Sequence, residues 1–446
     1  MNETTKTQIP ETEPVETGKK KQKKHRVRKF FCALLALIVL FVGVTTVITL
    51  IGLSASSKRA ASFRAVDVSA PEFENIGDGV WNIHADNGLK VLQLTDVHIG
   101  GGWMSIKKDG MAINAVAAMI TAEKPDFVIV TGDVAYPVPF QAGTFNNKSG
   151  AKIFAELMEN LGVYWTIAFG NHDTESYSYF SRDQIADFYS SGDYPHCLLQ
   201  KGPADVDGVG NQVFRVVNRD GLITRALILL DSHSYVDGDV FGVFWKYDNI
   251  HENQVAWYKS VVEGLQAENA ETVKKLGTDK AAAYGQLGKV PTSLFFHIPL
   301  TECKDAWYEY YDNGFQDTEN VQYLDGYVGE GKKQIYSGIH EDDLFETALE
   351  LGSTDTVFFG HDHLNNIALK YKGIILSYGM SVDYLAYPGI FKLGSQRGCT
   401  VLNVDAAGKL TYTKESYYQE KYTTQYPKEQ VTMQELKGER VLEDEN

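Results

Sequence analysis

Short polar clusters, each directly after an apolar run, limit most strongly how this chain can fold. The apolar runs end at Leu94, Val130, Phe169, Phe296 and Phe359. Each is short and rich in β-branched, leucine or aromatic residues, which is typical of buried strands. Between the first three runs, apolar residues recur at helical spacing near residues 113–120 and 153–161. Strands that alternate with helices in this way predict an α/β sandwich in which helices cover a sheet core.

The polar clusters contain the residue types that bind metal ions through oxygen and nitrogen. In chain order they are Asp96-Val97-His98, Gly132-Asp133, Gly170-Asn171-His172-Asp173, Phe296-His297 and Gly360-His361-Asp362-His363. Asp96 and His98 are two positions apart, so on extended backbone the two side chains point the same way. α/β sheets place their sites at strand ends. Mixed carboxylate, amide and imidazole donors suit zinc, manganese or iron rather than a thiolate-type site.

The order of these motifs resembles the calcineurin-like metallophosphoesterase superfamily over residues 91–365. The resemblance implies a metallophosphoesterase-type β-sandwich flanked by helices, with two metal ions of a kind left open among Mn, Fe and Zn. It implies that the first ion is held by Asp96, His98, Asp133 and His363, and the second by Asp133, Asn171, His297 and His361. Asp133 would then bridge the two ions.

Three further positions follow from the same resemblance. His172 matches the catalytic histidine that lies beside the phosphate without binding metal, and Asp173 follows it as in many members. Gly132-Asp133-Val134-Ala135-Tyr136 resembles the purple-acid-phosphatase-like branch, in which the tyrosine binds iron. This chain departs from true purple enzymes at His98, where they carry glycine. We therefore favour His98 as the ligand and expect Tyr136, like Asp173, to support the site from outside the ligand set.

The activity that the resemblance implies is hydrolysis of phosphate esters by a metal-activated hydroxide. A protonated His172 would stabilise the phosphoryl oxygens or donate a proton to the leaving alkoxide. The motifs do not separate monoesters from diesters, because pocket loops set the substrate. The alternative is a catalytically silent metal-binding protein of the cell surface on the same scaffold, which should have lost His172 or a ligand.

The stretch Phe30–Leu53 carries no charged residue and is long enough to cross a bilayer as a helix. Eight Lys and Arg residues lie between Lys19 and Lys29, against two directly after the stretch, Lys58 and Arg59. The positive-inside rule then predicts a single-pass membrane anchor with a cytoplasmic N-terminus and an extracytoplasmic catalytic domain. The alternative is a signal peptide cleaved near Ser56, which would release a secreted protein.

The chain therefore divides into a basic cytoplasmic tail (1–29), an anchor helix (30–53), a linker (54–75), a phosphoesterase domain (76–426) and a charged tail (427–446). The net charge is −16, although the first 59 residues hold 11 Lys+Arg and only 4 Asp+Glu. The remainder is strongly acidic, so nucleic acid is not expected as a partner. The four cysteines lack metal-ligand spacing and predict no essential disulfide, while a bridge from Cys197 to Cys303 or Cys399 stays open.

Overall fold

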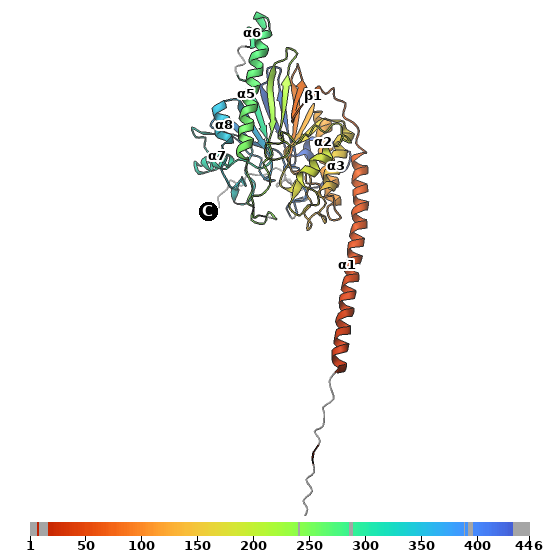
Figure 1. Cartoon of the computed structure of the whole chain (residues 1–446). Helices are drawn as coiled ribbons and strands as arrows, with labels where there is room; N and C mark the ends of the chain where they lie inside the picture. Colours follow the sequence, from red (N-terminus) through yellow and green to blue (C-terminus); the bar gives the residue numbers. More distant parts are fainter. Residues whose placement is uncertain are drawn as a thin grey trace, which may run out of the picture. The chain divides into compact units, whose positions relative to one another are not determined.

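The computed structural model describes residues 7–8 and 17–430, except 240, 285–288, 388 and 391–395. The chain separates into two compact units, residues 1–50 and 51–446. Within the described part of the second unit, helices cover two β-sheets (Figure 1). The charged tail expected over 427–446 lies outside the described residues apart from its first four.

The larger sheet has nine strands among the described residues, in the order β1-β2-β6-β7-β8-β10-β12-β11-β9. These strands are β1 (Glu72–Gly77), β2 (Val80–His84), β6 (Gln212–Val217), β7 (Ile223–Leu229), β8 (Thr292–Phe295), β9 (Val321–Asp325), β10 (Thr354–Phe359), β11 (Ala368–Tyr371) and β12 (Ile374–Tyr378). At its centre β7, β8, β10 and β12 run parallel, so their carboxyl ends reach the same edge.

The smaller sheet has the order β14-β13-β3-β4-β5 in the described part of the chain. Its strands are β3 (Leu89–Leu94), β4 (Phe127–Val130), β5 (Trp165–Ile167), β13 (Cys399–Val404) and β14 (Leu410–Glu415). β3, β4 and β5 are parallel, whereas β13 joins β3 antiparallel. Strand β13, near the C-terminal end of the domain, therefore pairs directly with β3, the strand that precedes the Asp96-Val97-His98 motif.

Apolar side chains fill three layers of core. Between the sheets, Phe127 and Leu402 of the smaller sheet pack with Phe214, Phe295 and Phe358 of the larger. Helices α2 (Ile106–Glu123), α3 (Asn147–Leu161) and α4 (Arg182–Tyr189) pack in the cluster of the smaller sheet. Helices α5 (Glu252–Lys275), α7 (Thr301–Asp312) and α8 (Leu344–Leu351) pack in the cluster of the larger sheet. The expected β-sandwich flanked by helices is thus confirmed.

Several short elements lie outside these layers. They are α6 (Thr278–Tyr284) and the 3₁₀ turns η1 (His172–Thr174) and η2 (Gly331–Lys333), whereas α9 (Tyr418–Lys421) buries Tyr418 in the cluster of the smaller sheet. The four cysteines are free in the structure. Their thiols do not contribute a disulfide, so the stability of the domain comes from its packed layers.

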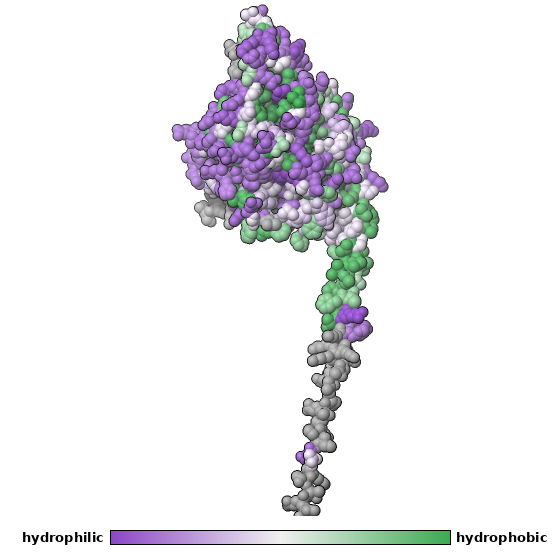
Figure 2. All heavy atoms as spheres, viewed as in Figure 1, coloured by the Kyte–Doolittle hydropathy of each residue, from purple (hydrophilic) through white to green (hydrophobic). Residues whose placement is uncertain are grey.

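Helix α1 (Thr17–Ala60) contains the apolar stretch found in the sequence. Its stretch His25–Ala60 is long and apolar enough to cross a membrane, with a mean hydropathy of 2.9 over an 18-residue window, although a signal sequence meets the same criteria. Figure 2 shows hydrophobic side chains covering this part of the helix. Phe30, Phe31, Leu35 and Leu37 are each more than 60% exposed, which is unfavourable in water and favourable in lipid.

The stretch expected as a linker, 54–75, is largely ordered against the domain. Helix α1 continues to Ala60, and Ser56, Ala60 and Phe63 are buried. The Arg59 guanidinium donates to the carbonyl of Gly110 on α2. Small Ser and Ala residues resemble a linker in composition, but they also allow a helix to pack closely against another. Strand β1 then begins at Glu72, before the domain boundary placed at residue 76.

Candidate metal centre

The seven expected ligands lie in loops that follow five strands. Asp96 and His98 follow β3, Asp133 follows β4, and Asn171 follows β5 in the smaller sheet. In the larger sheet, His297 follows β8, while His361 and His363 follow β10. Because these strands are parallel within their sheets, their carboxyl ends bring all seven side chains to one edge of the sandwich.

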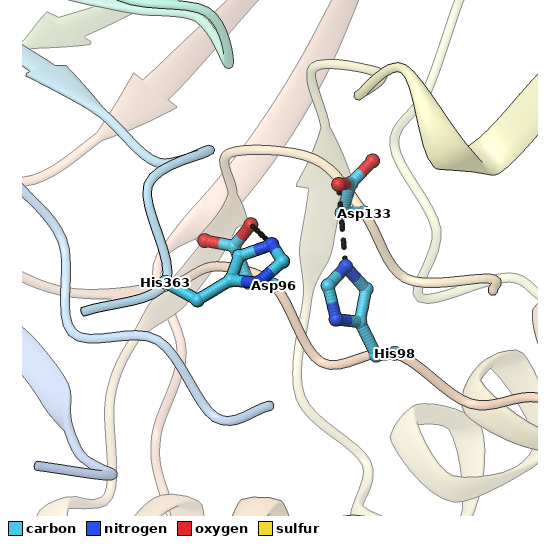
Figure 3. Close-up of side chains that lie close together, drawn as sticks. All are labelled: Asp96, His98, Asp133 and His363. Atoms are coloured by element: carbon cyan, nitrogen blue, oxygen red, sulfur yellow. Dashed lines mark hydrogen bonds and ion pairs between the residues drawn. The ribbon is translucent and has the colours of Figure 1, made fainter. Parts of the chain in front are cut away.

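The first predicted ligand set converges on one point. Asp96, His98, Asp133 and His363 each offer a ligand atom, and these atoms lie within 4.8 Å of one another. His98 Nε2 is 3.2 Å from Asp133 Oδ2, and His363 Nε2 is 3.5 Å from Asp96 Oδ1 (Figure 3). All four residues are buried. Two carboxylates and two imidazoles at this spacing match the donors of a transition-metal site.

The second predicted set meets the first at Asp133. His297 Nε2 lies 3.2 Å from Asp133 Oδ2 and 3.2 Å from Asn171 Oδ1. His361 Nδ1 lies 3.0 Å from that amide oxygen and 3.3 Å from His297 Nε2. The same atom, Asp133 Oδ2, is therefore the neighbour of His98 in one set and of His297 in the other. This placement suits a carboxylate oxygen shared by two ions.

The buried carboxylates of the cluster give it a negative charge that bound cations would offset. Buried carboxylates are costly without positive partners. Although burial opposes it, the Asp383 and Asp133 carboxylates raise the pKa of His98, and Asp133 raises the pKa of His297. Burial and the neighbouring His98 lower the pKa of His363 to about 3, so its ring is neutral. Without a metal ion, the His98 and His297 rings supply the positive charge that the buried carboxylates require, whereas bound cations would take over that role and leave the imidazoles neutral as ligands.

The backbone at the ligands is held in an uncommon conformation. The φ angles of Asp96, His98, Asp133 and His361 are 50°, 52°, 56° and 80°. Residues other than glycine rarely adopt the left-handed region, and such strain clusters at functional sites. Here it turns each ligand side chain out of the strand direction toward the shared centre.

Glycine is needed in the motifs because neighbouring atoms lie too close to leave room for a Cβ. A Cβ on Gly132 would lie 2.4 Å from His297 Nδ1, and one on Gly360 would lie 1.9 Å from Thr95 Oγ1. A Cβ on Gly170 would lie 2.1 Å from Asp133 Oδ1. The motif glycines therefore leave room for ligand side chains and for the Thr95 hydroxyl beside Asp96.

Replacing Gly170 by alanine should displace the Asp133 carboxylate and weaken metal affinity by about 10-fold to 100-fold, the range for residues that orient ligands. Metal content by mass spectrometry, after dialysis against graded metal concentrations, measures the change. Gly264→Ala on α5 is the matched control, because a Cβ there meets nothing within 4 Å. Equal metal content in both variants would contradict the steric argument.

Asp383 is a site residue that the sequence motifs do not reveal. It follows β12 and is fully buried, and its Oδ1 lies 2.8 Å from His98 Nδ1. Its Oδ2 lies 3.4 Å from His363 Nδ1, while the backbone N–H groups of Leu385 and Ala386 donate to the same carboxylate. Asp383 thus orients the His98 imidazole by its outer nitrogen and turns the inner nitrogen toward Asp133, whereas it lies beside His363 Nδ1 without a hydrogen bond.

Asp173 and Tyr136 lie outside both ligand sets. The Asp173 carboxylate accepts from the backbone N–H groups of Asp133, Ala135 and Gly170, each at 2.9 Å, and so ties the β4 and β5 loops together. The Tyr136 ring packs 4.6 Å from the His98 ring and 4.7 Å from the His172 ring. Its hydroxyl donates to the Gln141 side chain.

His172 lies beside the two ligand sets and faces a cavity of about 390 Å³. Its backbone N–H donates to Asp133 Oδ1, and its Nδ1 lies 2.7 Å from Glu175 Oε1. Although burial opposes it, Asp133 and Glu175 raise the pKa of His172, so the ring favours its protonated form. Glu175 was not anticipated, although its position three residues after His172 within a helical turn is a recognisable pairing distance.

A residue that follows β7 also fixes the loop that carries His297. The Ser232 hydroxyl accepts from the backbone N–H groups of His297 and Ile298 and so fixes the loop after β8. His233, four residues after the end of β7, lies outside both sets. Its Nε2 contacts the Gln254 amide oxygen, and its ring stacks on His251.

Comparisons with known proteins agree with this geometry. The sequence model of the family described as calcineurin-like phosphoesterase matches residues 89–365. "Probable inactive purple acid phosphatase 28" of Arabidopsis thaliana is 23% identical over 68% of this chain and 72% of that protein. Number 29 of the same Arabidopsis series is 27% identical over 71% and 77%. Phosphatase DCR2 of Saccharomyces cerevisiae is 27% identical over 69% of this chain and 48% of its own length.

Among solved structures, a dimetal phosphatase from Danio rerio is similar at 11% identity, with a TM-score of 0.42. The match covers 74% of this chain and 100% of that one.

Proposed function

Because this chain belongs to the calcineurin-like phosphoesterase family, we propose that it is an active, membrane-anchored enzyme that hydrolyses phosphate mono- or diesters outside the cytoplasm. The observation that carries the proposal is the complete pair of ligand sets, joined at Asp133 Oδ2, beneath a cavity that His172 also lines. Two ions fit these donors, and Mn, Fe and Zn are the candidates.

The alternative function is a catalytically silent metal-binding protein. The Arabidopsis relatives carry the word "inactive" in their names, which describes those proteins. A silent scaffold has no need of a polarised histidine at its cavity, whereas here His172 is paired with Glu175 at 2.7 Å. All seven ligand positions also hold residues with metal-binding side chains. These features favour catalysis.

The residues of the chain divide the work of hydrolysis. Bound metal ions would supply a water of lowered pKa and neutralise charge on the phosphoryl oxygens. Asp133 holds the two ligand sets together, and Asp383 keeps His98 oriented. His172, held by Glu175 and with its pKa raised by Asp133 and Glu175, lies where it can donate a proton to the leaving alkoxide.

The direct test uses the full chain purified in detergent and loaded with Mn, Zn or Fe. We expect turnover of an aryl phosphate monoester or diester that disappears on chelation and returns with metal. Metal content should be near two ions per chain in the active form. Two bound ions without turnover of either ester, for every metal, would favour the silent binding protein.

Two observations support a retained anchor over a cleaved signal. Helix α1 contains a stretch long and apolar enough to cross a membrane, and a basic cluster precedes it in the sequence. Ser56 and Ala60 are buried in the domain, so cleavage near Ser56 would place a charged amino group at a buried turn of helix.

The topology gives a separate prediction. Protease added to intact cells should digest the domain after Arg59 and spare the basic tail, because the charge asymmetry keeps that tail in the cytoplasm. The chain should also stay with membranes after a high-salt wash, which removes proteins held by charge alone. A mature protein that begins near Ser56 by N-terminal sequencing would refute the anchor.

A further inference from the structure

The walls of the cavity are aromatic, and its charged lining is acidic. Six tyrosines line it: Tyr136, Tyr177, Tyr235, Tyr247, Tyr336 and Tyr387. None of the described lining residues is Lys or Arg, while Glu175, Glu330 and Asp362 contribute carboxyl groups. Within the described lining the only candidate cation is then His172, which would serve the phosphoryl group and its leaving oxygen, so a second phosphate or a carboxylate on the leaving group would find no Lys or Arg to pair with. The cavity suits a phosphoryl group carried by an uncharged or apolar body.

Apolar side chains continue from the cavity onto the surface of one loop. Phe241, Val243, Phe244 and Trp245 are 60%, 65%, 68% and 63% exposed, and Phe241 and Trp245 also line the cavity. Four neighbouring large apolar residues at this exposure are unusual for a surface in contact with water alone.

Backbone hydrogen bonds fix the loop that carries them. Tyr235 and Tyr247 form a bridge at its base, and the N–H of Val236 donates to the carbonyl of Lys246. Inside the loop, the buried Asp239 carboxylate accepts from the N–H groups of Phe244 and Lys246. The apolar side chains are therefore presented outward by an ordered turn.

A second segment extends the exposed surface. The Phe241 ring lies 6.4 Å from Tyr177, which lies 6.0 Å from Phe145, and Phe145 lies 6.2 Å from the exposed Tyr179. Phe140, two residues after the lining residue Val138, is 89% exposed. We call this surface the apolar rim; it consists of Phe140, Phe145, Tyr177, Tyr179, Phe241, Val243, Phe244 and Trp245. The face of the domain shown in Figure 2 is largely hydrophilic, with a few hydrophobic patches.

We propose that the apolar rim docks on the surface of a lipid bilayer and that the substrate is a lipid phosphate, whose headgroup enters the cavity while its chains remain in the membrane. The substrate class rests on the proposed phosphoesterase function. Trp, Tyr and Phe are the residues that favour the bilayer interface. The chain also carries a helix long and apolar enough to cross a membrane, which would keep the domain at a bilayer.

The negative charge of the domain argues against docking by electrostatic attraction to anionic lipids. The sequence after Arg59 is strongly acidic, so anionic headgroups would repel it rather than attract it. Insertion of apolar side chains is the attraction that remains, and it resists salt. A protein partner or a second copy of this chain is the competing occupant of the rim.

The test uses the full chain reconstituted in vesicles of phosphatidylcholine with dioleoyl phosphatidic acid. We expect Val243→Ser/Phe244→Ser to lose about tenfold or more in turnover of the embedded lipid, because two side chains no longer enter the bilayer. Neither residue lines the cavity, so turnover of a soluble aryl phosphate should stay within about twofold. Ile76→Ser/Tyr308→Ser is the matched control, since both residues are exposed and lie outside the rim.

A second readout does not depend on activity. Lipids with a spin label in the upper chain should quench Trp245, so wild type should lose more fluorescence than Trp245→Phe in the same vesicles. Equal quenching, or equal lipid turnover by the rim and control variants, would overturn the proposal. So would a wild-type dimer that the rim variant converts to monomer, or a tenfold preference for nucleoside monophosphates. Quenching without turnover of any ester would refute the proposed function while leaving the docking surface supported.

Discussion

Replacing Asp133 by asparagine should remove metal from both ligand sets and lower kcat/KM by about 10³-fold or more, since metal ions contribute several kcal/mol to transition-state stabilisation. The physical reason is that Asp133 Oδ2 adjoins both His98 and His297, while Oδ1 accepts from the N–H of His172. An amide has one oxygen and no negative charge. It can keep one of these contacts, but it cannot serve two cations.

The control is Asp126→Asn, in which the amide oxygen can still accept from the N–H of Lys90 far from the centre. Metal content by mass spectrometry and turnover of an aryl phosphate should be unchanged in this control. If Asp133→Asn retained close to two ions per chain and near-normal turnover, the bridging role of Asp133 would be wrong.

Replacing His172 by alanine should keep both ions and reduce turnover of substrates with poor leaving groups by about 10² to 10⁴-fold, the range for general acid catalysis. The loss should be much smaller for aryl phosphates, because their leaving groups need little protonation. Glu175 raises the pKa of His172, so Glu175→Gln should weaken the same step by lowering the fraction of protonated ring.

His196→Ala provides the matched control, because His196 pairs with Glu159 outside both ligand sets. A plot of log kcat against leaving-group pKa for each variant separates proton donation from general damage. Loss of metal in His172→Ala would instead assign this histidine to the ligands.

The sequence predicted the sandwich because its strands and helices depend on local patterns, and the ligand loops were inferred from motifs that are equally local. Strands expected at residues 127–130 and 356–359 appear as β4 and β10, and an apolar run followed by Gly-His-x-His needs no distant information. The pairing of strands that are distant in the sequence could not be predicted from local patterns. Strand β13 joins β3 from about 300 residues away, and pairing of this kind is set by packing across the whole domain.

Asp383 and the apolar rim escaped prediction for the same reason. Asp383 acts on His98 from 285 residues away and carries no neighbouring histidine or glycine motif. Phe140 and Trp245 lie in loops, and sequence alone cannot tell a buried aromatic from an exposed one. The expected linker near Ser56 became ordered because its small side chains fit against the domain.

The segment that contains Arg59 and Ser62, at the start of the domain, lies against Tyr426, near the end of its described residues. The Arg59 guanidinium stacks over the Tyr426 ring at 4.2 Å, and the Ser62 hydroxyl lies 2.7 Å from the Tyr426 hydroxyl. The carbonyl of Tyr426 in turn accepts from the Asn114 side chain on α2. A domain whose ends meet behaves as a module with a single point of attachment. Such a module can be inserted into a loop of another protein, or circularly permuted by joining these ends, without stretching the sheets between them.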